Sequence, residues 1–374
     1  MSTSTLAASA AHVADVSATA YTIPTDAPEA DGTIAWDNTT LIVAQARWAD
    51  VIGLGWTYGS PACVDIINEL LAETVEGRSV FDVAGCFDAM VKAIRNIGRG
   101  GVGGQAISAV DVALWDLKAR VLQVPLHHLI GAVRDAVPVY GSGGFTTYDA
   151  GQLREQLTAW AKELGIPRVK IKIGESWGAR VDRDLARMAQ ARDVIGDDVE
   201  LYVDANGGYG RKQAVRVMNQ AADLDVRWLE EPVSSDDLEG LAQVRAAVRA
   251  DVAAGEYGYD PYYFRRMCEA GAVDCLQADA SRCGGITGWL HAAAVAAAYG
   301  LQISGHCAPH LHAPVALATP NLRHLEWFHD HARIEMLYFE GSVLPLDGMM
   351  RLDATRSGHG LTLRSEELEI YQVR

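Results

Sequence analysis

The sequence lacks the paired cysteines of a disulfide framework or a zinc ribbon. Its six cysteines are scattered over 374 residues, and no two of them form a CxxC pair. We therefore expect reduced thiols at all six positions, which are Cys63, Cys86, Cys268, Cys275, Cys283 and Cys307.

The chain also lacks an excess of positive charge and a long apolar run. Its 32 basic and 48 acidic side chains give a formal net charge of −16, which argues against binding to nucleic acid or to anionic membranes. The most apolar long stretch, residues 291–303, is mostly alanine and is far shorter than the roughly 20 residues that span a bilayer. The first residues have neither the basic start nor the apolar run of a secretory signal. These absences predict a cytoplasmic protein with a flexible tail at residues 1–12.

What remains is the composition of a globular protein with a large core, at 49% hydrophobic and 21% charged residues. Two strand-like segments, TTLIVAQARW (39–48) and VIGLGWTYG (51–59), predict an antiparallel meander. Between Pro61 and Gln123 the apolar residues recur with a helical period. The sequence therefore predicts a small α+β domain over residues 13–135.

After Val137 short apolar strands alternate with alanine-rich helices. Eight strands are expected, at residues 137–144, 169–174, 200–206, 227–232, 252–256, 275–281, 301–307 and 324–328. Regular alternation favours parallel pairing, and eight such units favour closure into a barrel. The predicted fold class is α/β, with a TIM barrel over residues 136–340 and a final segment, residues 341–374, that returns to the small domain.

An ionisable residue stands at the end of seven of these strands. They are Lys172, Asp204, Glu230, Glu256, Asp279, His306 and Glu326, and their successive separations of 20 to 32 residues each match one strand plus one helix. The C-terminal ends of barrel strands meet at one mouth, so these groups are expected to form a single site.

Three of them, Asp204, Glu230 and Glu256, are carboxylates on successive strands. Any one alone would more often cap a helix or pair with a base. Together they would repel one another, and a hard divalent cation is the usual remedy. An all-oxygen site suits Mg²⁺ best and Mn²⁺ next, whereas Zn²⁺ would require His or Cys ligands.

The remaining strand-end groups predict acid/base chemistry. Lys170 and Lys172 point to the same face of one strand, and their mutual repulsion is expected to lower the pKa of at least one. Asp279 is placed to orient His306. A protonated Glu326 could donate a hydrogen bond to a developing oxyanion.

These residues carry a resemblance. The motifs that bear it are KIK (170–172), DAN (204–206), EEP (230–232), GE (255–256), DASRCGGITGW (279–289), SGH (304–306), LE (325–326) and the segment 106–132, which resembles a linking helix into a barrel. The sequence is similar to the enolase superfamily, mandelate racemase subgroup, over nearly the whole chain. The resemblance implies a modified barrel of (β/α)7β type under a capping domain, and a symmetric homo-oligomer.

Residue by residue, the resemblance implies Mg²⁺ ligands at Asp204, Glu230 and Glu256, and a base at Lys172 with Lys170 as its neighbour. It also implies an acid/base dyad of His306 and Asp279, and an electrophile at Glu326. The implied reaction is removal of the proton α to the carboxylate of a small-molecule substrate. Dehydration of an acid sugar to a 2-keto-3-deoxy acid is the preferred outcome. A racemase or epimerase, a lactone cycloisomerase and a binding protein without turnover stay open as alternatives.

Substrate specificity is expected in loops of the capping domain at residues 21–29 and 54–59, and at single residues of the barrel mouth. The candidates are Thr22, Trp56, Tyr58, Asn206, Arg282 and His329. The first loop has no Arg or Lys, which favours a sugar with one carboxylate unless Arg282 or His329 binds a second. The run HLEWFHDH (324–331) is interpreted as a hydrophilic loop that contacts substrate hydroxyls, with a second metal site as the less favoured alternative.

Overall fold

The computed structural model describes residues 11–374. This part of the chain begins with three antiparallel strands. They are β1 (Asp15–Ala30), β2 (Ala35–Trp48) and β3 (Val51–Tyr58), arranged in the order β1-β2-β3. The predicted meander is confirmed. Of the predicted flexible tail, residues 1–10 lie outside the described part; Ala11 is buried and His12 forms a bridge with Ser79.

Residues 21–29 lie in β1 and residues 54–58 lie in β3. The loops expected at residues 21–29 and 54–59 are therefore wrong, whereas the strand-like segment at residues 51–59 is confirmed as far as Tyr58. Tyr21 pairs with Leu41, and Leu41 pairs with Tyr58, so both segments belong to the sheet. Alternate side chains of these segments are apolar and pack on the buried face of the sheet. From the sequence alone, such apolar residues could equally have belonged to a loop that packs on the core. Only residues 25–28 leave the ladder, where the register shifts between Pro24 and Glu29.

Helices of the capping domain follow the sheet. They are α2 (Ala62–Ile66), the π-helical turn η1 (Ile67–Leu71), α3 (Ala72–Val75), α4 (Val83–Ala93), α5 (Val102–Val121) and α6 (Leu126–Ile130). Helix α5 is buried along most of its length and packs on β3. The contact depends on glycine: a Cβ atom on Gly55 would lie 2.1 Å from the carbonyl oxygen of Ala109 in α5.

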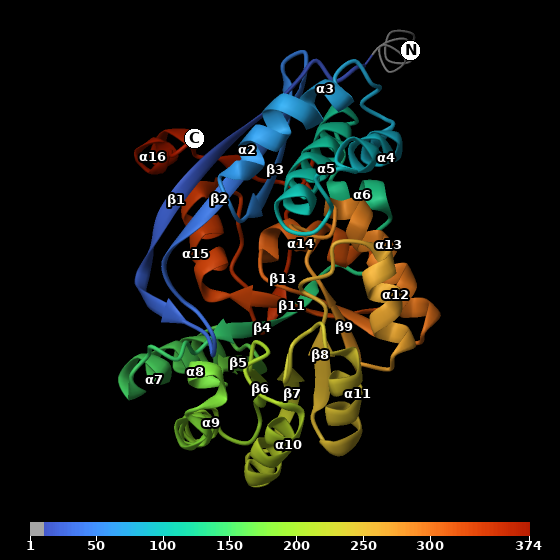
Figure 1. Cartoon of the computed structure of the whole chain (residues 1–374). Helices are drawn as coiled ribbons and strands as arrows, with labels where there is room; N and C mark the ends of the chain where they lie inside the picture. Colours follow the sequence, from blue (N-terminus) through green and yellow to red (C-terminus); the bar gives the residue numbers. More distant parts are fainter. Residues whose placement is uncertain (1–10) are drawn as a thin grey trace.

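Eight parallel strands then form a closed barrel (Figure 1). The strands are β4 (Val137–Gly143), β5 (Arg168–Lys172), β6 (Glu200–Asp204), β7 (Val226–Glu230), β8 (Asp251–Ala254), β9 (Cys275–Ala278), β10 (Gln302–Gly305) and β11 (Leu322–Phe328). Each strand pairs with its neighbour in sequence, and β11 pairs with β4 to close the ring. All eight predicted strands and the barrel are confirmed.

Helices follow the strands and surround the barrel. They are α7 (Ala150–Thr158) with η2 (Ala159–Glu163), α8 (Glu175–Gly178), α9 (Val181–Ile195), α10 (Arg211–Gln220) with η3 (Ala222–Leu224), α11 (Leu238–Ala247), α12 (Pro261–Glu269), α13 (Gly285–Ala298), α14 (Pro309–Leu317) and α15 (His329–Tyr338). The last of these, α15, begins directly where β11 ends.

The final residues form short elements: β12 (Phe339–Glu340), β13 (Met349–Met350), β14 (Thr362–Leu363), α16 (Ser365–Leu368) and η4 (Glu369–Tyr371). Near the C-terminus the backbone N–H of Val373 donates to the carbonyl oxygen of Ala20 in β1. The chain end thus contacts the first strand. The exact domain boundaries stay predictions.

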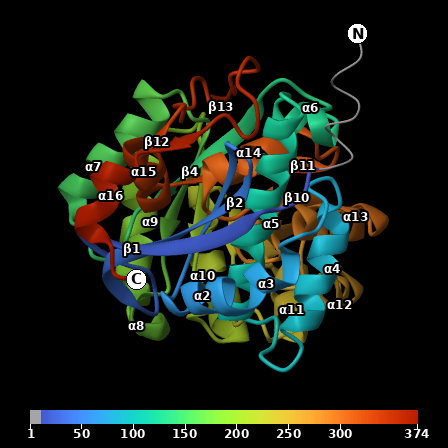
Figure 2. The same ribbon diagram turned by 90° about the horizontal axis from the view of Figure 1, so that it is seen from above.

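The β1–β2 hairpin reaches from the capping domain across the mouth of the barrel (Figures 1 and 2). Its tip is hydrogen-bonded to the loops that follow β4 and β5: Thr146 N–H donates to the Ala30 carbonyl at 2.8 Å, and Trp177 N–H donates to the Gly32 carbonyl at 2.9 Å. A Cβ on Gly32 would lie 2.4 Å from the carbonyl oxygen of Ile173, so the tip is seated directly on the barrel backbone.

Among the described residues, no helix combines the length and the apolar character needed to cross a bilayer. The six cysteines are free thiols, as predicted, and all of them are buried.

The close approach of β3 and α5 yields a stability prediction. Gly55→Ala must displace α5 from the sheet, because the added methyl group would meet backbone atoms that cannot move independently. We expect the free energy of unfolding to fall by about 2 kcal/mol or more, measured by urea denaturation. Gly100→Ala, where nothing lies within 4 Å of the added Cβ, is the matched control and should change stability little. Equal stability of the two variants would show that the contact is not tight.

Candidate active site

Strand register aligns the first three groups of the site. Lys172 is the register partner of Asp204 across β5 and β6, and Asp204 is the partner of Glu230 across β6 and β7. All three are therefore held side by side at the strand ends by the backbone ladder. All three side chains are buried.

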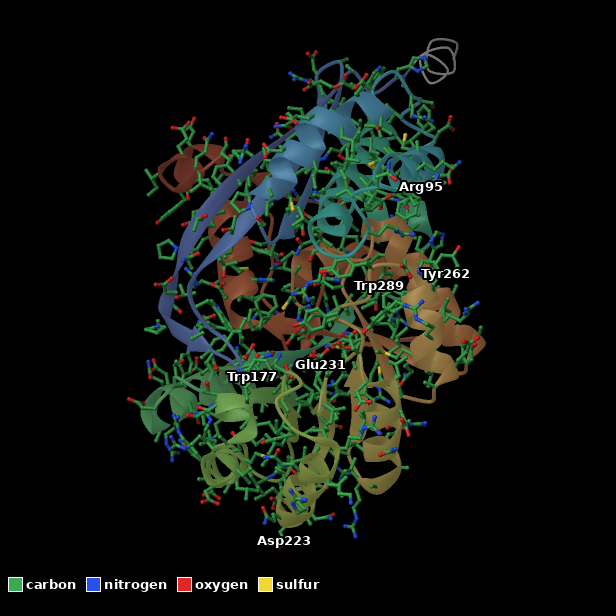
Figure 3. All side chains as sticks on the ribbon, viewed as in Figure 1. Arg95, Trp177, Asp223, Glu231, Tyr262 and Trp289 are labelled. Carbon is green, nitrogen blue, oxygen red and sulfur yellow. The ribbon has the colours of Figure 1, made fainter. Side chains whose placement is uncertain are left out.

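The other four groups complete the ring. Glu256 lies two residues beyond β8, Asp279 and His306 each follow the last residue of their strand, and Glu326 lies within β11. Ion pairs join Lys170 to Asp204, Glu230 and Glu326, and join His306 to Glu256 and Asp279. Ligand atoms of His306 and Glu326 lie within 4.8 Å of each other, so the seven strand-end groups predicted from the sequence do converge. Figure 3 shows Glu231, the neighbour of Glu230, at the barrel mouth below the capping domain.

Both lysines are paired with carboxylates. Lys172 Nζ lies 2.5 Å from Asp204 Oδ2. Lys170 Nζ donates to Glu230 and lies 2.8 Å from Glu326 Oε1. Burial alone would lower the pKa of both lysines, but the surrounding carboxylates outweigh burial and raise each pKa above its ordinary value. The expectation that repulsion leaves one lysine with a lowered pKa is therefore wrong for this arrangement, because three carboxylates face two ammonium groups.

The pKa values of the buried carboxylates shift in different directions. Burial opposes ionisation of Asp204, yet Lys172 and Lys170 hold its pKa below the ordinary value. Burial raises the pKa of Glu230 to about 7, with Lys170 opposing the shift and Asp204 adding to it. Burial and the charge of Glu256 raise the pKa of Glu231 well above its ordinary value. The site therefore holds more negative charge than its own lysines neutralise.

His306 and Asp279 form the predicted dyad. His306 Nδ1 lies 2.8 Å from Asp279 Oδ2, and its Nε2 lies 3.3 Å from Glu256 Oε2. Burial lowers the pKa of His306, but Glu256 and the bond to Asp279 outweigh burial and raise it. Asp279 is fixed in turn by the backbone N–H of Ser281 at 2.7 Å and by Arg282 Nε at 3.4 Å.

Glu326 is a hydrogen-bond acceptor here. It accepts from Ser142 Oγ at 2.6 Å and from the backbone N–H of Cys307 at 2.8 Å, in addition to Lys170. Burial would raise its pKa, but Lys170 and His306 hold it well below the ordinary value. The expectation of a protonated, donating Glu326 is wrong for this arrangement, since its partners are all donors.

The carboxylate cluster fits a hard cation. Glu256 Oε2 is buried and has no hydrogen bond, because His306 approaches it without hydrogen-bonding geometry. Asn206 Oδ1 and Glu231 Oε1 are also buried without partners among the described residues. These orphaned atoms and the carboxylates of Asp204 and Glu230 are all oxygen, which is the donor set that Mg²⁺ prefers.

The weaker substrate-binding candidates of the capping domain lie in its sheet. Trp56 is fully buried and donates from Nε1 to Glu335 at 3.0 Å. Tyr58 is also buried, and its ring stacks on His331 with centroids 3.5 Å apart. Thr22 Oγ1 pairs with Thr40 Oγ1 across the hairpin at 2.9 Å. Trp56 and Tyr58 thus join the cap to the barrel.

Of the barrel candidates, Asn206 and Arg282 lie within the site. Asn206 follows Asp204 in a left-handed conformation, with φ 44°, and its N–H donates to Asp204 Oδ1. Arg282 lies 3.2 Å from Glu256 and 3.4 Å from Asp279, so its charge is already neutralised. His329 instead faces Asp26 of β1, at 3.0 Å.

Residues 324–331 do not form a loop. Strand β11 ends at Phe328 and α15 begins at His329. The three histidines of this run have different surroundings. His324 lies in the barrel interior against Tyr202 and Ser304, His329 faces Asp26, and His331 stacks on Tyr58. The interpretation of this run as a hydrophilic loop is wrong, because strand and helix follow each other without an intervening residue.

Sequence reasoning missed two residues of the site. Ser142 reaches Glu326 from β4, the one barrel strand without an ionisable end. Glu231 is buried and has a φ of 39°, and the negative charge of Glu256 helps to raise its pKa. A search of the strand ends for hydroxyl groups as well as ionisable groups would have found Ser142. Glu231 was visible in the EEP motif but was not assigned.

Comparison with known proteins identifies the family. Residues 152–368 match the profile of the enolase C-terminal domain-like family, and residues 35–131 match the mandelate racemase / muconate lactonizing enzyme N-terminal domain. The chain belongs to the mandelate racemase/muconate lactonizing enzyme family. The resemblance drawn from the motifs is confirmed.

Three relatives illustrate the range of this family. A mandelate racemase/muconate lactonizing enzyme-like protein from Rubrobacter xylanophilus superposes with a TM-score of 0.93 at 45% identity and covers 97% of this chain and 100% of its own. L-talarate/galactarate dehydratase of Salmonella typhimurium is 32% identical over 87% of this chain and 81% of its own. A 3,6-anhydro-α-L-galactonate cycloisomerase of Streptomyces coelicolor is 30% identical over 84% of this chain and 86% of its own.

The Salmonella enzyme has been solved with Mg and L-lyxarohydroxamate, with a TM-score of 0.89 to this chain at 29% identity, coverage of 100% of this chain and 96% of its own. Mg²⁺ is thus the cofactor of this family, as predicted.

The dyad yields a pH prediction. Asp279→Asn removes a bond that raises the pKa of His306, so that pKa should fall, and the imidazolium should lose its proton at lower pH. The measurement is an NMR titration of the His306 ring nitrogens. Asp279→Glu, which retains the negative charge, is the control and should keep the pKa raised. An unchanged His306 titration in Asp279→Asn would contradict the coupling.

Proposed function

We propose that the protein removes the proton next to a substrate carboxylate and then expels a β-hydroxyl group, which dehydrates an acid sugar to a 2-keto-3-deoxy sugar acid. One observation carries the proposal: acid/base groups flank the carboxylate cluster on both sides. Lys172 Nζ lies 2.5 Å from Asp204, and His306 Nε2 lies 3.3 Å from Glu256. Relatives named as talarate/galactarate, rhamnonate, gluconate and arabinonate dehydratases support it.

Asp204, Glu230 and Glu256 would hold the Mg²⁺ ion. When bound, the ion stabilises the negative charge that develops on the substrate carboxylate as the α-proton leaves. Lys170, buried beside Glu230 and Glu326, adds a fixed positive charge to the same region. Without such stabilisation an α-proton is far too weakly acidic for an amine or an imidazole.

Lys172 is the proposed base. The negative charge of Asp204 raises the pKa of Lys172 and so keeps its Nζ protonated. If Asp204 binds a cation, that charge is neutralised, the pKa of Lys172 falls, and Lys172 can act as a base. Its Nζ then accepts the α-proton. On the other side, His306 gives the proton on Nε2 to the departing β-hydroxyl, which leaves as water, while Asp279 holds the ring through Nδ1. The resulting enol tautomerises to the keto acid, as its β-carbon takes up a proton and its hydroxyl group loses one.

The site favours a substrate with one carboxylate. Arg282 is already paired with Glu256 and Asp279, and His329 is paired with Asp26. Neither is free to bind a second carboxylate at the far end of a sugar. A mono-acid such as an aldonate therefore fits the charges better than a diacid.

Isomerisation is the second candidate. With bases on both sides of the α-carbon, a proton returned from the face opposite to its removal would give a racemase or an epimerase. The cycloisomerases among the relatives favour this class too, because they are of comparable identity to the dehydratases.

Incubation with Mg²⁺ in D₂O distinguishes the outcomes. The protein is offered a panel of mono- and di-acid sugars and sugar lactones, and keto acid and α-deuterium are followed together. We expect keto acid from a mono-acid sugar and complete loss of turnover in EDTA, restored by Mg²⁺. Deuterium incorporation without keto acid would move the assignment to an isomerase, and turnover that survives EDTA would contradict the metal-assisted mechanism.

Two variants separate the roles of the bases. Lys172→Ala should reduce α-proton exchange by a factor on the order of 10²–10⁴ while Mg²⁺ binding persists. His306→Asn should stop product formation yet leave Lys172-dependent exchange with a substrate of suitable configuration. Exchange at the native rate in Lys172→Ala would remove Lys172 from the mechanism.

A further inference from the structure

A second cluster of metal-ligating side chains lies between the capping sheet and the barrel. It consists of Asp26 and Glu29 from β1 and His329 from the start of α15. One ligand atom from each residue lies within 4.8 Å of the other two. Donors that each lie about 2.1 Å from one ion are at most about 4.2 Å apart, so small side-chain movements would allow all three residues to bind the same ion. The cluster shares no residue with the carboxylates of the candidate active site.

The irregular part of β1 brings Asp26 into this position. Residues 25–28 leave the ladder between Pro24, which pairs with Asn38, and Glu29, which pairs with Trp36. Such a bulge re-aims side chains that a regular strand would direct elsewhere. It turns Asp26 to His329, whose Nε2 lies 3.0 and 3.2 Å from the two carboxylate oxygens.

Glu29 is the independent sign of a ligand. Its side chain is 0% exposed. Oε2 accepts a hydrogen bond from Trp36 Nε1 at 2.8 Å, but Oε1 has no partner among the described residues. A buried carboxylate oxygen without a donor is costly, so something must neutralise it.

The surrounding charges do not supply that partner. Asp330 adds a third carboxylate, and Arg333, a guanidinium beside the cluster, is engaged by it. Arg333 Nη2 donates to Asp330 at 2.7 Å and to the Pro24 carbonyl at 2.8 Å. Three carboxyl groups thus face one guanidinium and one imidazole, so Glu29 either keeps a proton or shares a further cation.

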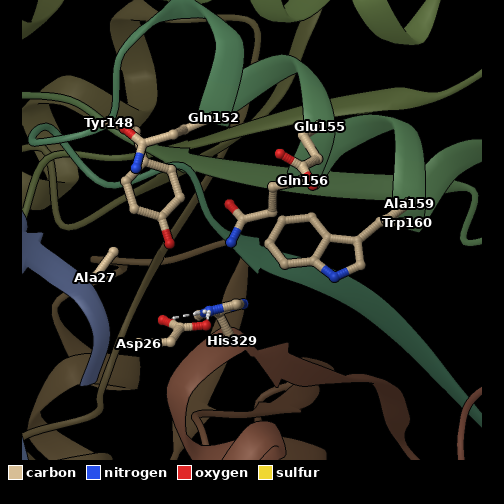
Figure 4. A pocket seen from close by; sticks show the side chains of 9 residues that line it. All are labelled: Asp26, Ala27, Tyr148, Gln152, Glu155, Gln156, Ala159, Trp160 and His329. Atoms are coloured by element: carbon tan, nitrogen blue, oxygen red, sulfur yellow. Dashed lines mark hydrogen bonds and ion pairs between the residues drawn. The ribbon is translucent and has the colours of Figure 1, made fainter. Parts of the chain in front are cut away.

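The cluster is open to solvent on one side. Asp26 and His329 line a cavity of about 330 Å³ whose opposite wall includes Tyr148 and Gln156 (Figure 4). The side chains of His329 and Asp26 are 24% and 46% exposed, so an ion can enter and complete its coordination with water. A closed pocket lined by the same residues would exclude both the ion and the water molecules.

We propose that Asp26, Glu29 and His329 form a second metal site that binds a divalent transition-metal ion and joins the β1 bulge to the β11–α15 junction. Two carboxylates and one imidazole are a mixed oxygen and nitrogen set, which suits Zn²⁺ and its transition-metal neighbours better than Mg²⁺. The bound ion fixes the hairpin that crosses the barrel mouth to the barrel itself.

Zn²⁺ binding in excess Mg²⁺ tests the site. The full chain, with any purification tag removed because tag histidines bind Zn²⁺, is stripped with EDTA and dialysed against Zn²⁺ and excess Mg²⁺. We expect one Zn²⁺ retained per wild-type chain, and at least about tenfold weaker binding in His329→Gln and in Glu29→Gln. Asp37→Asn, an exposed carboxylate of the same hairpin opposite the bulge, is the matched control and should bind as the wild type does.

A melting experiment guards against misfolded variants. Zn²⁺ should raise the melting temperature of the wild type and of Asp37→Asn, and not that of His329→Gln, while all of them melt alike in EDTA. Retention of no Zn²⁺ by the wild type would overturn the proposal, because Glu29 would then simply keep a proton. It would equally be overturned if His329→Gln retained Zn²⁺ and His306→Asn lost it, since the ion would then belong to the His306, Cys307 and Glu326 group.

Discussion

Burying several carboxylates in one layer at the barrel mouth is the constraint on which the rest of the site depends. Asp204, Glu230 and Glu256 cannot share a water-poor volume without cations, and the neighbouring strands supply them. Lys170 and Lys172 come from β5, and Arg282 comes from the turn after β9. Burial opposes the ionisation of Asp279 and Glu326, but His306 and Arg282 lower the pKa of Asp279, and Lys170 and His306 lower the pKa of Glu326.

The capping domain is attached to the barrel by the same kind of chemistry. Asp111 in α5 accepts two hydrogen bonds from Thr287 of α13, and Asp116 accepts from the backbone N–H groups of Leu54 and His359. Glu335 of α15 binds Trp56 and His310. Buried carboxylates with satisfied oxygens thus define one relative position for cap and barrel, because any slip would leave them without donors.

The barrel and the convergence of its strand-end charges were predictable from sequence, because the C-terminal ends of barrel strands meet at one mouth. Lys172, Asp204, Glu230, Asp279 and His306 follow this rule. The cap was less predictable. Whether residues 21–29 are a loop or a strand depends on pairing with β2, and the contact of Asp26 with His329 joins residues about 300 positions apart through a bulge that has no sequence signature. Ionisation states also escaped prediction, since the state of Glu326 depends on every charge around it.

The pairing of Lys172 with Asp204 and of Asp204 with Glu230 along the sheet also bears on how such a protein can diverge. These side chains are positioned by strands whose backbone hydrogen bonds do not change when a helix lengthens or a loop gains residues. Insertions around the outer ring therefore leave the spacing of the reacting groups intact. The hairpin over the mouth has no such protection, and a single added residue in its bulge redirects every side chain that follows. The ladder thereby conserves the positions of the barrel side chains, while the geometry of the cap is free to change.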